Sequence, residues 1–390
     1  MGHDSLDLSS HGLLKPLVRA EDLLARLDER VARSNQGPGF LERQHFTDAA
    51  AALWLAGELV HVEDLVLHDG RMDVRAPTHE ITRAHGVLRA RRRIAGNRPD
   101  WALSPAGLGV LVAREGEGAP PPVMPAEAPG HAERAREEDE EPEPLAEEFA
   151  EIDAVLARAG RTLAEKGAVQ GADTFAAPWP LPAPAAPAGF AEAGEAVLGA
   201  LMRDPDRDET ALLGEWLAVV RRAEAEALPP VMAAFLAWEA WERIEPLERQ
   251  RWLGNLLVAA LLRKSGKTGA HLAGLSAGLR DISRERRQSR DRATRCLAFL
   301  EALSAAALAG AREIDRLELA AAQMERRLKG KRRNSSLPRL AELILSRPMV
   351  SAGLVAAELK VTQRAALNLI DELGVRELTG RGRYRAWGIV

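Results

Sequence analysis

The middle of the chain carries a segment whose composition is incompatible with a hydrophobic core. Between residues 115 and 150, 12 acidic residues stand against two basic ones, and prolines cluster at 120–122 and 178–187. A segment of this kind cannot bury enough apolar surface to offset the entropy lost on ordering. The sequence therefore predicts a linker over residues 114–190, containing one helix, with folded regions on either side.

The folded regions follow from the chain length and from this division. At 390 residues the chain is too long for one comfortable core, so we expect two or three folded units. The predicted order around the linker is an N-terminal helix at 1–36, a helical part at 37–113, a helical domain at 191–328, a basic connector at 329–336 and a C-terminal module at 337–390.

The composition favours helices over sheets. Aromatic residues make up only 4% of the chain, and a single cysteine, Cys296, rules out an internal disulfide. Cys296 lies in an apolar run and is expected to be an inert core thiol. No run reaches the roughly 18 apolar residues that a membrane span needs. We therefore expect a mainly α, cytoplasmic protein that has no membrane contact.

Apolar residues recur at helical spacing in both halves of the chain. The predicted core stripes of the first half are Leu17, Leu23, Leu24 and Leu27, and then Phe46, Ala50, Leu53, Trp54 and Leu59. Thr78 is a typical capping residue for a third helix that runs to about residue 93. The helices predicted in the second half cover 196–202, 210–227, 230–244, 251–264 and 292–327, with Trp238 and Trp241 as core anchors.

The last 54 residues show three short helical patterns followed by two candidate strands. The first helix has to end before Pro348, because the residue before a proline disfavours the helical region. Ser351 and Thr362 are the expected caps of the second and third helices, and Gly374 is the expected end of the third. The strands are expected at 375–378 and 384–390. This order predicts a helix-turn-helix with a hairpin wing.

The third helix carries side chains suited to reading duplex DNA. Arginine can grip a guanine edge, and glutamine or asparagine can pair with adenine. The predicted DNA-contacting residues are Thr362, Gln363, Arg364, Leu367 and Asn368 on the helix, Arg381 and Arg383 in the wing, and Arg332 and Arg333 in the connector. Residues 326–390 contain 14 basic and five acidic residues, as expected for a module that binds a polyanion. A winged helix that serves only protein contacts is the alternative.

Three segments also carry a resemblance to known proteins. Residues 338–387, above all 350–362 and 379–385, resemble the winged helix at the C-terminus of many Fic-family proteins. Residues 261–264, with the helix that follows, are similar to the segment after the Fic active-site motif. Residues 57–65 resemble the Fic inhibitory region. Over nearly its full length the chain is more similar to a family of uncharacterised bacterial proteins that join a domain of unknown function to a C-terminal helix-turn-helix.

The departures from the Fic pattern bear on catalysis. Where Fic enzymes carry a His-Pro-Phe motif, this chain has Glu245, Pro246 and Leu247, and Arg249 stands at the acidic metal position. The resemblance implies that the catalytic base and the glycines that bind phosphate are missing, and that Ala56 replaces the inhibitory glutamate. The fold expected is a helical, degenerate Fic-like body with a small α+β winged helix-turn-helix. We expect no enzyme activity, no cofactor and no metal.

Other motifs give weaker indications. Residues 266–268 (Gly-Lys-Thr) lack the first glycine and the strand of a phosphate-binding loop, and are expected to form a turn. Five histidines between 45 and 85 lack metalloprotease spacing. The arginines between 284 and 295 could extend a DNA-binding surface or lie in solvent. Three hypotheses remain: a DNA-binding regulator whose helical body forms a homodimer or senses an effector; a Fic-like protein-interaction scaffold; and a nucleotidyltransferase with a rebuilt site at Glu245.

Overall fold

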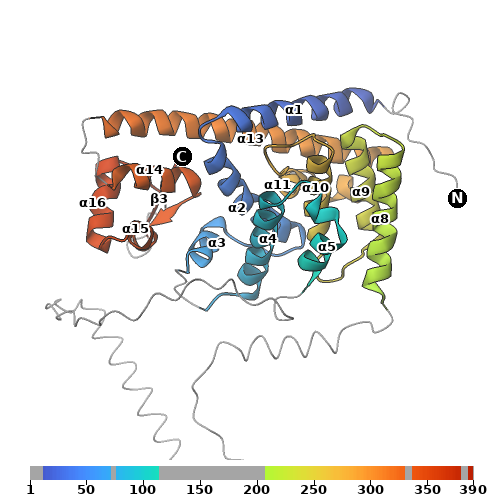
Figure 1. The fold of residues 1–390 in the computed structure, drawn as a ribbon, viewed down its shortest axis with the longest axis horizontal. Helices are drawn as coiled ribbons and strands as arrows, with labels where there is room; N and C mark the ends of the chain where they lie inside the picture. Colours follow the sequence, from blue (N-terminus) through green and yellow to red (C-terminus); the bar gives the residue numbers. More distant parts are fainter. Residues whose placement is uncertain (1–11, 72–75, 114–206, 330–335, 379–384, 390) are drawn as a thin grey trace, which may run out of the picture. The chain divides into compact units, whose positions relative to one another are not determined.

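The computed structural model describes residues 12–71, 76–113, 207–329, 336–378 and 385–389. These residues belong to one compact unit that combines the N-terminal part with everything after residue 206. The unit is mainly helical, with a small three-stranded sheet near the C-terminus (Figure 1), which confirms the predicted fold class. The predicted linker and the helix at 196–202 lie outside the described residues.

The N-terminal part forms a series of helices with sequence-encoded ends. They are α1 (Leu14–Arg33), α2 (Gly37–Leu55), α3 (Val62–Asp69), α4 (His79–Gly96), the 3-10 turn η1 (Trp101–Leu103) and α5 (Pro105–Val112). The Thr78 hydroxyl accepts a hydrogen bond from the backbone N–H of Ile81, so the predicted cap of α4 is confirmed. Ser104 caps α5 in the same way, with Pro105 in the first turn.

The second half adds the helices of the larger core. They are α8 (Glu209–Ala225), α9 (Pro230–Ile244), α10 (Leu253–Lys264), α11 (Leu275–Arg280), α12 (Arg284–Arg287) and α13 (Arg292–Leu328). The apolar spacing predicted α8, α9, α10 and α13 to within two residues at each end. The short helices α11 and α12 were not predicted, because four to six residues are too few to show a helical period.

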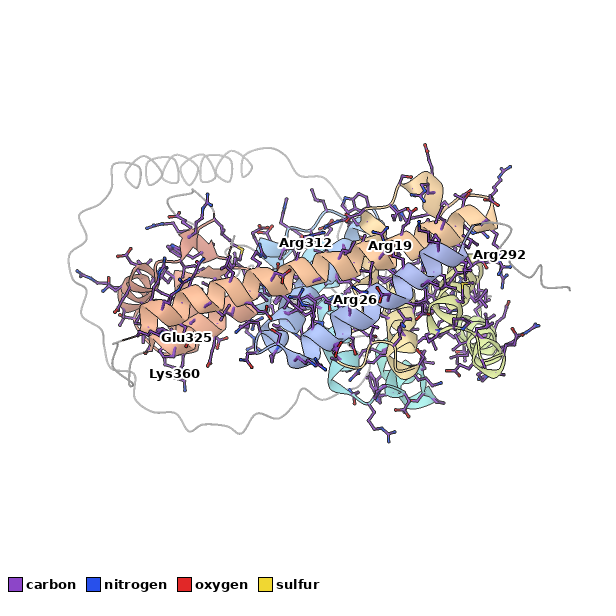
Figure 2. The ribbon with its side chains drawn as sticks, turned by 90° about the horizontal axis from the view of Figure 1, so that it is seen from above. Arg19, Arg26, Arg292, Arg312, Glu325 and Lys360 are labelled. Carbon is purple, nitrogen blue, oxygen red and sulfur yellow. The ribbon has the colours of Figure 1, made fainter. Side chains whose placement is uncertain are left out.

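Helix α13 is the element on which the other helices pack. It runs for 37 residues beside α1 (Figure 2), and it also contacts α2, α9, α11, α14 and α16. Helices α1 and α13 are joined by an ion pair between Arg30 and Asp315 at 2.5 Å. The Ser34 hydroxyl, just after α1, also donates a hydrogen bond to Glu318 of α13 at 2.7 Å. By length and composition α13 could cross a membrane, but half of its most apolar window is buried inside the protein, as in a core helix.

Tryptophans fill the core between α8 and α9. Trp238 and Trp241 are buried, as predicted, and Trp216 is fully buried, with its indole N–H donating to the carbonyl of Ala237 at 2.8 Å. The prediction for the end of α2 was wrong. Trp54 is 43% exposed, and Leu59 lies beyond the helix and is 69% exposed. Helix α2 ends at Leu55, so the apolar stripe does not continue to Leu59.

A buried ion pair joins α2, α4 and the start of α11. Arg91 of α4 is fully buried and donates to the Asp48 carboxylate of α2 and to the carbonyl of Leu272. Asp48 also accepts from the backbone N–H of Ala277 at 2.8 Å. Burial raises the pKa of Asp48, and the charge of Arg91 opposes that shift. Removing either partner would leave a buried charge without compensation.

The C-terminal module consists of three helices and a small antiparallel sheet. Its elements are α14 (Leu337–Ser346), β1 (Val350–Ser351), α15 (Ala352–Leu359), α16 (Gln363–Leu373), β2 (Arg376–Glu377) and β3 (Ala386–Gly388). The strand order is β1-β3-β2, with Trp387 opposite both Val350 and Glu377. Strands β2 and β3 lie within the predicted strands at 375–378 and 384–390, whereas β1 was not predicted. The tip of the predicted hairpin lies outside the described residues.

Close packing of α11 on α13 depends on a glycine. A methyl group at Gly278 would overlap the carbonyl oxygen of Ala302, whereas one at Gly214 of α8 would meet nothing within 4 Å. Gly278→Ala should therefore lower the free energy of unfolding by about 1–3 kcal/mol. Gly214→Ala should raise it by about 0.5–1 kcal/mol, because alanine loses less backbone entropy in a helix. Urea unfolding followed by tryptophan fluorescence measures both; equal effects would contradict the packing described.

Candidate nucleic-acid interface

Helices α15 and α16 form a helix-turn-helix. Lys360 ends α15 in the left-handed region, with a φ of 54°, and so reverses the chain over a very short distance. The Thr362 hydroxyl accepts from the backbone N–H of Ala365, and Ser351 accepts from Leu354, so both predicted caps are confirmed. Gly374 ends α16 with a φ of 66°.

The exposed face of α16 presents the predicted helix residues to solvent. Ala366, Ile370 and Leu373 are buried against the rest of the module. The exposed residues in the first two turns are Thr362, Gln363, Arg364, Leu367 and Asn368. The structure thus brings the five predicted helix residues together on one accessible surface.

The charge on α16 is uneven from one end to the other. Arg364 has no hydrogen bond or ion pair to any residue that the structure describes, so its guanidinium is available to a ligand. Asp371 and Glu372 are exposed near the other end of the helix. A polyanion would therefore be attracted to the N-terminal half of α16, where the helix dipole is also positive.

The remaining predicted contacts are only partly described. Arg332, Arg333, Arg381 and Arg383 lie outside the described residues. Arg385, next to the hairpin tip, pairs with Glu377 at 2.7 Å and stacks over the Trp387 ring at 5.1 Å. The charge of Arg385 is therefore paired with Glu377 of β2.

The module is attached to the helical body through an arginine that the sequence did not single out. Arg43 of α2 is 4% exposed and donates to the carbonyls of Ile344 and Arg347, at the C-terminal end of α14. Its Nε also pairs with Glu313 of α13 at 2.6 Å. The unpaired carbonyls at the end of a helix are strong acceptors, so Arg43 binds α14 to α2 and α13 at once.

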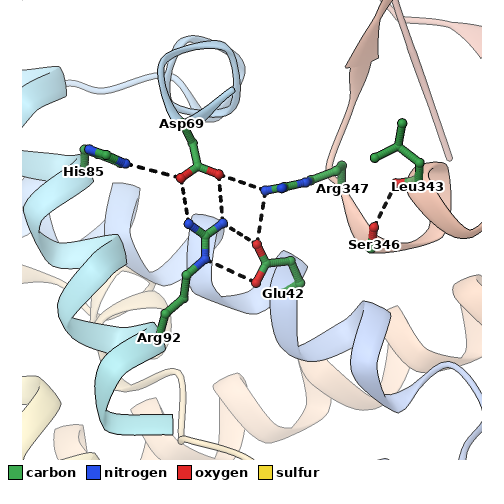
Figure 3. Close-up of polar contacts among 7 residues, drawn as sticks. All are labelled: Glu42, Asp69, His85, Arg92, Leu343, Ser346 and Arg347. Atoms are coloured by element: carbon green, nitrogen blue, oxygen red, sulfur yellow. Dashed lines mark hydrogen bonds and ion pairs between the residues drawn. The ribbon is translucent and has the colours of Figure 1, made fainter. Parts of the chain in front are cut away.

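A network of charged side chains also joins Arg347, at the end of α14, to the helical body (Figure 3). Arg347, which follows α14, donates to Glu42 at 3.1 Å and to Asp69 at 2.8 Å. Arg92 of α4 pairs with the same two carboxylates, and Nε2 of His85 lies 3.2 Å from Asp69. Side chains from α2, α3 and α4 thus meet the C-terminal module at one point.

The network is partly shielded from water, and this changes the titration of Asp69. Burial raises the pKa of Asp69, but hydrogen bonds from Arg92 and His85 and the charges of Arg92 and Arg347 together hold it well below its ordinary value. The guanidiniums of Arg92 and Arg347 also lie over the ring of Phe46, 5.2 and 5.5 Å from its centre.

Comparisons with known proteins give family matches for two parts of the chain and a relative that matches over its whole length. Residues 201–329 match the family described as "Protein of unknown function (DUF1612)", and residues 337–390 match the family described as "HTH DNA binding domain". The chain is 43% identical over 401 residues, and over 100% of both chains, to the "Uncharacterized protein y4cF" of Sinorhizobium fredii. The chain belongs to the same family as this protein. The helix-turn-helix family match agrees with the module formed by α14 to β3.

In the helical domain that matches this family, the residues compared with the Fic motif make contacts within the fold. Glu245 ends α9 in the left-handed region and pairs with Arg251. Arg207 donates to the Glu245 carbonyl, Pro246 and Leu247 are buried, and the carbonyl of Arg249 accepts from Arg83.

The weaker motifs also find structural explanations. Lys267 pairs with Glu21, and Thr268 is buried in the connection between α10 and α11. Arg292 and Arg295 both pair with Glu239, so part of the second basic cluster is neutralised. Burial raises the pKa of the Cys296 thiol to about 12, as expected for an unreactive core residue.

The titration of Asp69 gives a testable pH dependence. Because its pKa is lower in the folded chain than the ordinary 3.8, Asp69 contributes stability above that pH and loses it progressively below. Asp69→Asn should therefore lower stability near neutral pH and make the acid-induced loss shallower. Asp64→Asn, at an exposed position of the same helix, is the matched control. Thermal unfolding across pH measures both; parallel curves for wild type and Asp69→Asn would contradict the network.

Proposed function

We propose that this chain is a DNA-binding regulator of transcription that acts in the cytoplasm and reads duplex DNA with α16. The observation that carries the proposal is the exposed N-terminal half of α16, where Arg364 has no partner among the described residues. Its neighbours Gln363 and Asn368 are exposed and chemically suited to base edges. The match of residues 337–390 to a DNA-binding helix-turn-helix family supports the same conclusion.

In this proposal the module is a winged helix. The antiparallel pair β2–β3 forms the base of the hairpin, and Arg376 is exposed on β2. Arg381 and Arg383, which lie between β2 and β3 in the sequence, would contact phosphates or an adjacent minor groove. Ser351 and Thr362 keep both helices of the motif in place through their caps.

The contribution of Arg364 can be separated from that of charge alone. Arg364→Ala should weaken binding to a preferred genomic fragment by about 1–3 kcal/mol, because a bidentate contact to a base is lost. Arg19→Ala removes the same charge from an exposed position on α1 and should leave affinity unchanged. Fluorescence anisotropy with random-sequence and genomic fragments measures both variants.

The wild-type salt dependence tests the proposal as a whole. The logarithm of affinity should fall linearly with the logarithm of salt concentration, by about 0.9 per phosphate neutralised. A flat salt response, or equal affinities for wild type and Arg364→Ala, would overturn DNA reading by α16.

The helical body acts without catalysis in this proposal. Glu245 is engaged with Arg251, and its backbone carbonyl with Arg207, which supports a structural role at the end of α9. We therefore expect no transfer of a nucleotide to the protein when it is incubated with ATP radiolabelled at the α-phosphate, and Glu245→Ala should leave DNA affinity unchanged. Label that appears on the wild type and disappears in Glu245→Ala would favour the nucleotidyltransferase hypothesis instead.

A further inference from the structure

The recognition helix α16 is held at its C-terminal end by a residue of the helical body. Arg327 lies in the last turn of α13, outside the helix-turn-helix module. Its Nη1 donates to the carbonyl of Leu373 at 2.5 Å and to that of Gly374 at 2.7 Å. These carbonyls belong to the last turn and the cap of α16, where a helix carries partial negative charge. The guanidinium of Arg327, from α13, therefore satisfies carbonyls at the C-terminal end of α16.

The sequence of the module leaves room for this guanidinium. Gly374 adopts a φ of 66°, which glycine reaches without strain. A Cβ atom at this position would lie 2.5 Å from Nη1 of Arg327 and 3.1 Å from its Cζ. The same glycine thus ends α16 and permits the approach of Arg327.

Among the residues that the structure describes, two arginines of the helical body bind the module at helix ends. Arg43 holds the end of α14 and Arg327 holds the end of α16, and the two residues come from α2 and α13. Two separate attachments oppose rotation of the module against the body, which a single attachment would allow. The position of α16 therefore depends on α13.

We propose that Arg327 is a positioning residue for DNA reading, through which α13 sets where α16 lies. The proposal rests on the DNA binding proposed above. Arg327 binds the C-terminal end of α16, whereas Arg364 lies in its first turn. The two ends are separated by the length of the helix, which rises about 1.5 Å per residue. Arg327 therefore orients the reading surface without contributing a base contact, and DNA affinity becomes a property of body and module together.

The neighbouring residue provides a matched control. Arg326 carries the same charge in the same turn and is exposed, as Arg327 is, but its Nε donates to the carbonyl of Ala322 within its own helix. Arg327→Ala and Arg326→Ala therefore remove equal charge from full-length protein, and only the first removes a contact with α16. Arg327→Lys retains the positive charge and an ammonium group that can donate to the carbonyls at the end of α16, so its loss of DNA affinity should be smaller than that of Arg327→Ala.

Two measurements on the three variants test the positioning role. Hydrogen exchange should show faster exchange of the backbone amides of α16 in Arg327→Ala than in Arg326→Ala or the wild type. Affinity for the genomic fragment that the wild type prefers should fall about tenfold in Arg327→Ala, as loss of a charge-assisted hydrogen bond implies. The salt slope should stay unchanged, because no phosphate contact is lost.

The outcomes separate this inference from the proposed function. Unchanged exchange in α16 of Arg327→Ala would show that Arg327 does not hold the helix, whatever the DNA result. Faster exchange with unchanged affinity, while the wild type binds DNA, would overturn its role in reading. Failure of the wild type itself to bind DNA would overturn the proposed function, and the positioning of DNA reading with it.

Discussion

The packing of α13 against its neighbours is the constraint on which the rest of the structure depends. This helix contacts α1 and α2 from the N-terminal part, α9 and α11 from the second half, and α14 and α16 from the C-terminal module. Close approach is permitted where side chains are small: Leu27 and Phe40 pack directly over Gly310. Because helices that are far apart in the sequence all pack on α13, the N-terminal helices and the helices after residue 206 form one compact unit.

The C-terminal module combines one free face with one attached face. Its α16 surface is open and carries Arg364, while the end of α14 is bound by Arg43 and by the network around Asp69. A helix-turn-helix on a flexible tether would search for DNA independently of its body. In the proposed function these attachments would make the body part of the DNA-binding geometry, so that a ligand or partner that shifts the body would change DNA affinity through a defined contact.

The local features of the fold were accessible from sequence, and the long-range ones were not. Thr78, Ser351 and Thr362 announce helix starts because their hydroxyls act on amides three residues away. Arg327 contacts residues 46 or more positions away in the sequence. Its acceptors are backbone carbonyls, which every residue has, so the amino-acid pattern does not reveal the contact. The sequence placed the exposed face of α16 correctly. It gave no sign that Arg43 and Arg347 support it.

Arginine contacts to carbonyls at helix ends have a consequence for how such a protein can diversify. Arg263 binds the carbonyls of Ile94 and Asn97 at the end of α4, just as Arg43 and Arg327 bind those of α14 and α16. A backbone carbonyl accepts a hydrogen bond whichever side chain its residue carries, provided that the side chain leaves room for the guanidinium, as Gly374 does for Arg327. In the proposed function, the exposed face of α16 can therefore change towards a new DNA sequence while the contacts of Arg327 with the carbonyls of Leu373 and Gly374 are kept. Correlated substitutions between relatives would therefore not reveal the contact between Arg327 and the carbonyl of Leu373.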